Sequence, residues 1–443
     1  MTDVPNFRIR TLGKCAIPSP VSDYFDSDSA FVDDEGRVLY DSRLDEAARR
    51  GCPVAELPSL ERAGPRRRIY FDPSKCRAGI VTCGGLCPGL NNVIRGVTLT
   101  LNYQYGVRKV YGFQYGYEGF IPKYRHEVLT LTPERVDSIH EQGGTILASS
   151  RGEQSAEEIV DCLDRMDINL LFAIGGDGTM RGAQAVAAEI ARRDLNISVV
   201  GIPKTIDNDI SFTDVSFGFQ TACSVAIQAL RSAHVEAKGA PNGIGLVKLM
   251  GRHSGFIACA ATLALPDVNF VLIPEVPFEL EGAQGLYERL RRRLEKRGHA
   301  VVVVAEGAGQ NLFTPSGLTR IAPRTDASGN VKLKDIGILL RDGVAGWFQA
   351  KGVPVNVKYI DPSYLIRSVP ANSVDSVFCG ELARNAVHAA LAGRTEMLIG
   401  NWKHAFVHVP IETAISVRKK VDPRGELWQG VIETTGQPGL VNS

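Results

Sequence analysis

The stretch AIGGDGTMRG (173–182) places three glycines around one carboxylate. The glycines are Gly175, Gly176 and Gly178, and the carboxylate is that of Asp177. Glycines let backbone N–H groups approach phosphate oxygens, and a carboxylate can hold the Mg²⁺ that a phosphate chain needs. If Thr179 were simply the N-cap of the next helix, the threonine would be explained but the glycines would not. We therefore predict a nucleotide-phosphate site here.

The stretch VVGIPKTIDNDISF (199–212) carries more polar residues after its apolar run than a turn needs. They are Lys204, Thr205, Asp207, Asn208 and Asp209. An Asx-turn built by Asn208 and Asp209 accounts for part of this polarity, but not for the lysine and the threonine. A carboxylate at a strand end that faces a phosphate donor can take the proton of an attacking hydroxyl. Because the two aspartates alternate on an extended segment, we expect one to be a base while the other holds Mg²⁺ or the loop.

Three other strand ends carry candidate site residues. In TCGGLCPGLNNVIRG (82–96), Gly84 and Gly85 could admit an anion at the start of a helix near Asn91, although a plain tight turn fits equally well. In LVKLMGRHSGF (246–256), Arg252 suits a phosphate on the acceptor, with a surface arginine as the simpler alternative. Glu306 directly follows four valines, where it could order a loop or hold sugar hydroxyls.

These residues follow short apolar runs that alternate with helical patterns from Ala78 onward. The runs lie at 78–83, 170–176, 197–203, 243–251, 269–275, 299–307 and 355–361, and amphipathic segments lie at 217–238 and 281–298. Apolar runs without alternation are typical of strands that are buried on both faces. We therefore predict an α/β fold with parallel sheets, in which ligands bind just beyond the carboxyl ends of the strands. Residues 1–76 are turn-rich, so we expect them to form an N-terminal extension.

The composition is that of an ordinary globular protein. The chain has 443 residues, a net charge of +1 and 44% hydrophobic residues, which suits two or three domains and favours neither nucleic acid nor membrane as a partner. Nine cysteines in mostly apolar surroundings indicate reduced thiols, and the CxxxC pair at 83 and 87 lacks the further ligands of a zinc site. No secretory start and no 18-residue apolar run are present, so we expect a cytoplasmic protein.

Taken in order, GGDGT, PKTIDND, LMGR and YLIRS (364–368) resemble the 6-phosphofructokinases, and the resemblance extends from about Gly79 to the C-terminal region. The segments GLCPGLNNVIRG, GIGLVKLMGR and AEGAGQ are similar to the ATP-dependent branch of plants and trypanosomatids. The resemblance implies transfer of a phosphoryl group from ATP, with Mg²⁺, to the 1-hydroxyl of fructose 6-phosphate. It also implies two Rossmann-like domains with the active site in the cleft between them. We place a nucleotide domain at 77–216 and a sugar-phosphate domain at 217–443, with part of 368–400 returning to the first.

The resemblance also implies individual roles. Asp207 matches the proton acceptor, with Thr205 and Ile206 in the same sugar-binding turn, and Asp177 matches the residue that positions Mg²⁺. The expected contacts to the donor are Gly84, Arg151, Gly152, Gly176, Asp177, Gly178 and Thr179. The expected contacts to fructose 6-phosphate are Met250, Gly251, Arg252, Glu306, Tyr364, Leu365, Ile366 and Arg367, the two arginines lying near its 6-phosphate. Lys204 and the arginines would stabilise developing charge.

The chain departs from the compact bacterial members of the family at two places. Gly243 stands where those members have an arginine from a neighbouring subunit, and the first 75 residues have no counterpart in them. Their effector site is therefore not assumed here. We still expect an allosteric enzyme that forms a homodimer or homotetramer.

The donor is the least determined feature. Gly178 favours ATP, because an aspartate there would fill the space of the α-phosphate and repel it, whereas Lys204 would suit pyrophosphate equally well. NAD kinases and diacylglycerol kinases share GGDGT but would not explain the MGR and YLIRS motifs. A non-catalytic sugar-phosphate-binding subunit is disfavoured because Asp177 and Asp207 are both present.

Overall fold

The computed structural model describes residues 5–25, 27–43, 51, 53–313 and 331–442. Contacts divide the chain into two compact units, which are described separately below. Unit 1 consists of Met1–Thr205, Ile210–Gly218 and Ser368–Arg418, and unit 2 consists of Ile206–Asp209, Phe219–Arg367 and Lys419–Ser443. The domain boundaries near residues 76 and 216 stay predictions.

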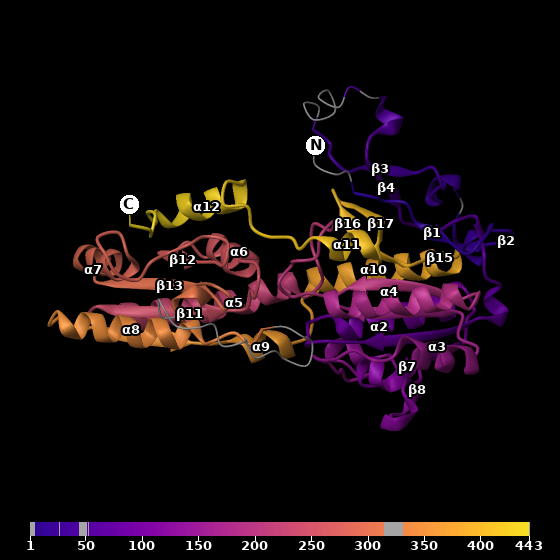
Figure 1. Ribbon diagram of the computed structural model, residues 1–443, viewed down its shortest axis with the longest axis horizontal. Coiled ribbons are helices and arrows are strands. Elements are labelled where there is room, and N and C mark those ends of the chain that lie inside the picture. Colours follow the sequence, from indigo (N-terminus) through magenta and orange to yellow (C-terminus); the bar gives the residue numbers. More distant parts are fainter. Residues whose placement is uncertain (1–4, 26, 44–50, 52, 314–330, 443) are drawn as a thin grey trace. The chain divides into compact units, whose positions relative to one another are not determined.

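Unit 1 is built on a nine-stranded sheet (Figure 1). In order across the sheet, its strands are β3 (Arg37–Leu39), β4 (Ser59–Arg62), β17 (Ala405–Pro410), β16 (Met397–Trp402), β10 (Ser198–Pro203), β9 (Leu170–Gly175), β6 (Arg77–Thr82), β7 (Lys109–Phe113) and β8 (Val128–Thr130). The five strands from β16 to β7 run parallel, and the strands beyond them pair antiparallel. Two short pairs, β1 (Arg10–Thr11) with β15 (Arg394–Thr395) and β2 (Ile17–Pro18) with β5 (Arg68–Ile69), lie outside this sheet.

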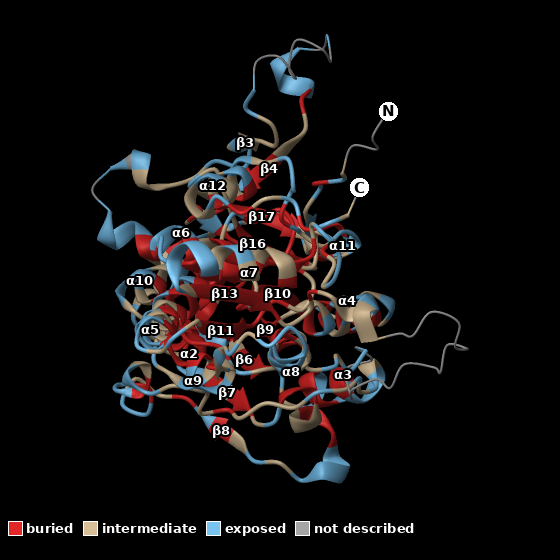
Figure 2. Ribbon diagram, turned by 90° about the vertical axis from the view of Figure 1, so that its left-hand side faces the viewer, coloured by how far each residue is buried: buried red, intermediate tan, exposed pale blue. Residues whose placement is uncertain are grey.

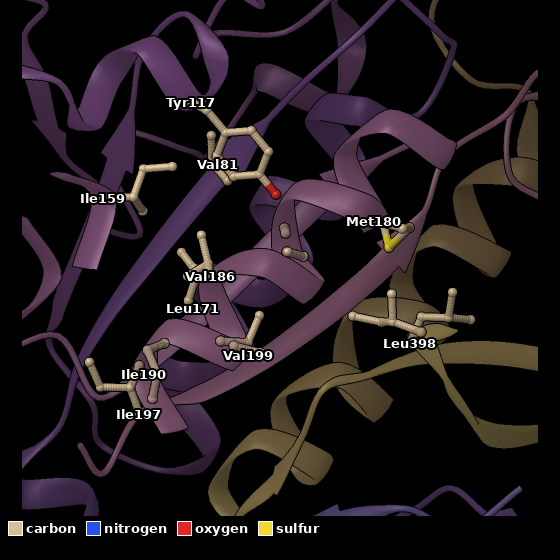
Figure 3. Packing of buried hydrophobic residues seen from close by; sticks show 14 of the residues in the cluster. Val81, Tyr117, Ile159, Leu171, Met180, Val186, Ile190, Ile197, Val199 and Leu398 are labelled. Carbon is tan, nitrogen blue, oxygen red and sulfur yellow. The ribbon is translucent and has the colours of Figure 1, made fainter. Parts of the chain in front are cut away.

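Helices pack on both faces of the central strands. These helices are α2 (Leu90–Leu99), α3 (Ala156–Arg165), α4 (Asp177–Arg192), α10 (Ser373–Leu391) and α11 (Ile411–Ser416). Helix α10 contacts α2, whereas α4 contacts α3 and α11. One core joins α4 to the sheet, and Figure 3 shows Val186 and Ile190 of the helix among Leu171 and Val199 of the strands. Every residue of β9 and β10 is buried, as the uninterrupted apolar runs predict (Figure 2).

Unit 2 contains a smaller, fully parallel sheet. Its order is β12 (Phe270–Leu272), β13 (His299–Ala305), β11 (Gly243–Leu249) and β14 (Asn356–Ile360). The helices of this unit are α5 (Phe219–Lys238), α6 (Phe256–Ala264), α7 (Leu286–Arg297), α8 (Ile336–Ala350), α9 (Ser363–Ser368) and α12 (Glu426–Thr435). Helices α7 and α8 enclose a core that includes Leu290, Val302 and Leu340.

The predicted α/β class is confirmed, and each of the seven predicted strands and two predicted helices is present. The pattern did not reveal β3 and β4 in the N-terminal segment, nor the pair β16 and β17 near the C-terminus. Strand β4 pairs with β17, so the two regions lie side by side in one sheet (Figure 1). Within the described ranges, no helix has the length and apolar character needed to cross a membrane.

Candidate active site

The donor residues expected from the sequence gather at one edge of the large sheet. Strands β10, β9 and β6 are neighbours, with Pro203 opposite Gly175 and Thr82 opposite Ile174. Because these strands are parallel and in this register, the segments that follow them come together at their carboxyl ends. The structure therefore brings residues 83–85, 176–179 and 204–205 to the same edge within unit 1.

Two cationic side chains reach the glycine loop after β6. Lys204 is buried, and its Nζ donates a hydrogen bond of 2.7 Å to the Gly85 carbonyl. A Cβ atom on Gly84 would lie 3.5 Å from this Nζ, and one on Gly85 would lie 3.4 Å from Nη2 of Arg151. Gly84 also has a φ of 84°, which favours glycine. A loop with close-lying ammonium and guanidinium groups is complementary to phosphate oxygens.

Gly152, beside Arg151, also has a left-handed backbone, with a φ of 110°. Because glycine reaches this conformation without strain, the residue suits the tight loop that carries Arg151. The structure therefore places Arg151 next to the glycine loop of unit 1, and Gly152 follows it in the chain.

The second element of the expected donor site is the start of α4. Gly176 is the N-cap of this helix and Asp177 its first residue, so the first N–H groups of the helix are available for an anion. Thr179 lies within the first turn and is buried, and its carbonyl accepts a 2.8 Å hydrogen bond from Tyr117. The alternative that Thr179 is the N-cap is therefore wrong. A Cβ atom on Gly178 would meet nothing within 4 Å, so open space borders this position.

Asp177 has a partner that the sequence did not indicate. Nε of Arg418 donates a 3.2 Å hydrogen bond to Oδ2 of Asp177, and Nη2 of Arg418 forms an ion pair with the same oxygen. Arg418 lies 241 positions away in sequence. It begins the run Arg418–Lys419–Lys420, which resembles an ordinary solvated charge cluster, so no local signal could have linked it to Asp177.

The carboxylate of Asp177 fits one type of Mg²⁺ site. Among the residues that the structure describes, no three His, Cys, Asp or Glu side chains come together as a metal site. A single carboxylate at a phosphate-binding helix start suits a Mg²⁺ ion that is held mainly by the phosphates of a nucleotide. Asp177 thus fits a nucleotide-bound ion and not a cage made by the protein alone.

The acceptor residues gather in the same way in unit 2. Strand β11 lies between β13 and β14, with Leu249 opposite Ala305 and Val247 opposite Ile360. The segments after these three parallel strands carry Met250–Arg252, Glu306 and α9. The structure therefore brings the expected fructose 6-phosphate residues to one edge of the smaller sheet.

Asp207 lies in a turn within this group. Asn208 has a φ of 56°, so the prediction that Asp207 and Asp209 alternate along an extended segment is wrong. Oδ2 of Asp207 accepts a 3.2 Å hydrogen bond from the Arg252 amide. The Asp207 carbonyl accepts a 3.1 Å bond from Oγ of Ser254. Two contacts from the loop after β11 therefore fix this turn within unit 2.

The glycine of the MGR motif has a steric reason. Gly251 has a φ of 128°, and a Cβ atom there would lie 2.4 Å from the Ser254 carbonyl oxygen. Only glycine therefore allows the tight loop that presents the Arg252 amide to Asp207.

The charge state of Asp207 is shifted toward neutrality. Burial and the negative charges of Asp209 and Glu306 raise the pKa of Asp207 from 3.8 to about 7. The hydrogen bond from the Arg252 amide and the positive charge of Arg367 oppose this rise. Its Oδ1 is buried and has no hydrogen-bond partner within the described part of the chain. A carboxylate with these properties can accept a proton near neutral pH.

Glu306 and the two arginines form the rest of the group. Burial raises the pKa of Glu306, while the charges of Arg367 and Arg252 oppose this rise. The Arg252 guanidinium also donates to the Val331 carbonyl. The structure therefore combines carboxylates with two guanidinium groups, which suits a ligand that carries hydroxyls and a phosphate.

The remaining expected residues differ in exposure. Tyr364 and Leu365 are exposed on α9, whereas the side chains of Met250, Ile366 and Ile206 are buried in the protein. Thr205 is the last residue of its stretch of unit 1, and its carbonyl accepts a 2.5 Å hydrogen bond from Oγ of Ser216.

Comparison with known proteins places the chain in a family. The phosphofructokinase family model matches residues 77–390. The ATP-dependent 6-phosphofructokinase of Amycolatopsis methanolica is 51% identical over 437 residues, covering 98% of this chain and 95% of its own length. The protein of the same name from Trypanosoma cruzi is 45% identical over 409 residues, covering 91% and 82%. Plant proteins of that name are also relatives, so the resemblance to this branch is confirmed.

Solved structures agree at the level of fold. A pyrophosphate-dependent phosphofructokinase from Nitrosospira multiformis superimposes with a TM-score of 0.65 at 18% identity, covering 83% of this chain and 93% of its own. An identity this low supports the fold alone. The sequence relatives and the family match are stronger, and together they show that this chain belongs to the phosphofructokinase family.

Proposed function

We propose that this chain transfers the γ-phosphoryl group of ATP to the 1-hydroxyl of fructose 6-phosphate, giving fructose 1,6-bisphosphate and ADP in glycolysis. The observation that carries the proposal is Asp207, a buried carboxylate with a raised pKa beside Arg252, in a chain whose relatives are named ATP-dependent 6-phosphofructokinase. The roles of the individual site residues are part of this proposal.

The chemistry divides between the two units. Asp207 takes the proton of the sugar's 1-hydroxyl. At the same time, the hydroxyl oxygen forms a bond to the γ-phosphorus of ATP, and the bond between that phosphorus and the bridging β,γ-oxygen breaks. Arg252 and Arg367 hold the 6-phosphate of the sugar, and Glu306 accepts hydrogen bonds from its hydroxyls. These roles use only groups that belong to unit 2.

In unit 1, Lys204 and Arg151 stabilise negative charge on the donor above the glycine loop, and the N–H groups at the start of α4 bind a phosphate. Mg²⁺ bound through Asp177 would neutralise charge on the phosphate chain. The hydrogen bond from Arg418 fixes the orientation of the Asp177 carboxylate.

ATP is the preferred donor in this proposal. The space beside Gly178 is open, so a nucleotide phosphate is not obstructed there. Pyrophosphate is the alternative donor, and the pyrophosphate-dependent structures resemble this chain in fold only, at 18% and 22% identity.

The test is a coupled assay of the purified protein with saturating fructose 6-phosphate and Mg²⁺. We expect turnover with ATP and little with pyrophosphate, and no turnover when NAD replaces the sugar phosphate as acceptor. Faster turnover with pyrophosphate than with ATP would overturn the choice of donor. Nucleotide binding without turnover of fructose 6-phosphate would contradict the proposed activity itself.

We propose further that the enzyme acts in the cytoplasm as a homodimer or homotetramer under allosteric control. Light scattering would give the mass of the assembly. A sigmoidal dependence of the rate on fructose 6-phosphate would reveal the control.

A further inference from the structure

Strand β11 carries a buried lysine, Lys248, that the sequence analysis did not single out. Its Nζ lies 2.7 Å from Oδ2 of Asp335 and 2.9 Å from Oδ2 of Asp361. Burial lowers the pKa of Lys248, but the hydrogen bonds to the two carboxylates raise it above its ordinary value. The side chain therefore stays charged, and a buried ammonium of this kind is stable only while its partners remain in place.

The second oxygen of each carboxylate, Oδ1, accepts hydrogen bonds at the start of a helix. Oδ1 of Asp361 accepts from the amide and hydroxyl of Ser363, at 3.1 and 2.5 Å, where α9 begins. Oδ1 of Asp335 accepts from the amides of Gly337 and Ile338, at 3.0 and 3.2 Å, where α8 begins, and from the hydroxyl of Tyr359 on β14, at 3.3 Å. Lys248 thus joins the starts of two helices to the same strand.

Only one of these helices belongs to the acceptor site. Helix α9 carries Tyr364 and Arg367, and β11 leads from Lys248 into Met250–Arg252. Val247 of β11 lies opposite Ile360 of β14 in the sheet. Lys248 directly follows Val247 and Asp361 directly follows Ile360, so the two residues lie side by side. Helix α8 carries none of the proposed substrate residues and packs on the core through Leu340 and Val344.

We propose that Lys248 is a positioning residue of the acceptor site, which acts through Asp361 to fix the start of α9 relative to β11 and so to hold Arg367 beside Arg252 and Glu306. The inference rests on the proposed function, because it assigns α9 to the binding of fructose 6-phosphate. Lys248 itself does not touch the substrate in this arrangement.

The two partners of Lys248 provide a matched pair of variants. Their side chains are equally exposed, at 35% each, and each is bound to the same ammonium. We expect Asp361→Ala to raise KM for fructose 6-phosphate about ten-fold or more, the size of losing a hydrogen bond to a charged group, without changing KM for ATP. Asp335→Ala should leave both KM values within about two-fold. Equal effects of the two variants on KM for fructose 6-phosphate would overturn the proposal.

A double-mutant cycle tests whether Lys248 is the link. Lys248→Met and Asp361→Ala should be strongly non-additive in their effect on KM for fructose 6-phosphate, because each removes the same contact. Lys248→Met and Asp335→Ala should be close to additive for this constant. Additive effects in both cycles would show that Lys248 does not act through Asp361. If Lys248→Met fails to fold, Lys248→Gln, which also removes the ammonium, takes its place in both cycles.

Hydrogen exchange of the protein without substrates separates this inference from the proposed function. Asp361→Ala and the Lys248 variant should speed amide exchange in residues 363–368, whereas Asp335→Ala should speed it in residues 336–340. Unchanged exchange at 363–368 in the Lys248 variant would reject the positioning role of Lys248 even if the enzyme is fully active. If the wild-type protein does not phosphorylate fructose 6-phosphate, the proposed function fails while the exchange result still decides the role of Lys248.

Discussion

The two oxygens of the Asp207 carboxylate have different surroundings. Oδ2 is held by the Arg252 amide, whereas Oδ1 is buried without a partner among the described residues. A buried polar atom of this kind is costly unless a ligand completes it. We infer that Oδ1 is the atom that meets the sugar hydroxyl.

Replacement of this carboxylate gives the first prediction. Asp207→Asn should preserve the fold and sugar affinity, and should lower kcat by about 10²- to 10⁴-fold, because the amide cannot accept the proton. In the wild type, kcat/KM should fall as the pH is lowered through about 7, since the base must be ionised and the pKa of Asp207 is raised to about 7. The residual activity of the variant serves as control, since pH effects on the substrates persist in it. A variant with near-normal kcat would remove Asp207 from the mechanism.

A local sequence pattern indicates candidate site residues more readily than it indicates their partners. Asp177 and Asp207 stand out because each follows an apolar run, which is a local pattern. Arg418 and Lys248 bind carboxylates 241 and 87 positions away, and such pairs form only when distant strands come together. The left-handed backbone of Asn208 was also missed, although asparagine tolerates it better than most residues.

Strand ends explain why the proposed donor residues lie at one sheet edge in unit 1 and the proposed acceptor residues lie at another in unit 2. Parallel strands in register bring their following loops to the same edge, so motifs far apart in sequence meet. This much was predictable from the positions of the glycines. Strands β3 and β4 were not predictable, because they are short and carry charged residues such as Arg37, Glu61 and Arg62. Pairing of β4 with β17, and of β3 with β4, stabilises them more than their own pattern does.

The start of α4 allows a test of donor choice. Gly178→Asp should fold normally, because a Cβ atom there meets nothing within 4 Å and an acidic residue is favourable in the first turn of a helix. The new carboxylate would occupy the space of a nucleotide phosphate and repel its negative charge, so kcat/KM for ATP should fall by about ten-fold or more. Steady-state kinetics at saturating fructose 6-phosphate measures this change.

A matched control exists in unit 2. Gly346 of α8 is also a helical glycine at which an added Cβ atom would meet nothing within 4 Å, so Gly346→Asp adds the same charge elsewhere. It should leave kcat/KM for ATP unchanged. If both variants lose activity equally, the effect of Gly178→Asp is not specific to the donor.

Over the whole chain, the units are not consecutive in sequence. The chain passes from one unit to the other after residues 205, 209, 218, 367 and 418. The turn that carries Asp207 is therefore a segment of unit 2 between two stretches of unit 1. No composition change marks such short segments, because what assigns them to a unit is contact with distant residues.

The N-terminal segment is part of the large sheet and supplies a buried charge to it. Glu61 of β4 accepts hydrogen bonds from Arg66, Arg394 and His408, at 3.1, 3.0 and 3.1 Å. Burial opposes ionisation, but His408 and the two guanidinium groups lower the pKa of Glu61 to about 2. Glu61 therefore joins the N-terminal strands to residues more than 300 positions later.

Removal of this charge gives the last prediction. Glu61→Gln should lower the free energy of unfolding by about 1.5–3 kcal/mol, because the buried Arg66 and Arg394 would lose their buried counter-charge and keep only the exposed carboxylate of Asp34. Glu288→Gln is the control, since Glu288 also binds two arginines, Arg291 and Arg292, but in partly exposed pairs of α7 that are worth about 1 kcal/mol or less.

Urea unfolding followed by circular dichroism compares the two variants with the wild type. The folded-state pKa of Glu61 is depressed, so its stabilisation is complete above its ordinary pKa of 4.5 and is lost as the pH falls toward about 2. The Glu61→Gln variant should lack this part of the acid dependence. Equal losses of stability for Glu61→Gln and Glu288→Gln would mean that the charge of Glu61 adds no more to stability than a partly exposed ion pair does.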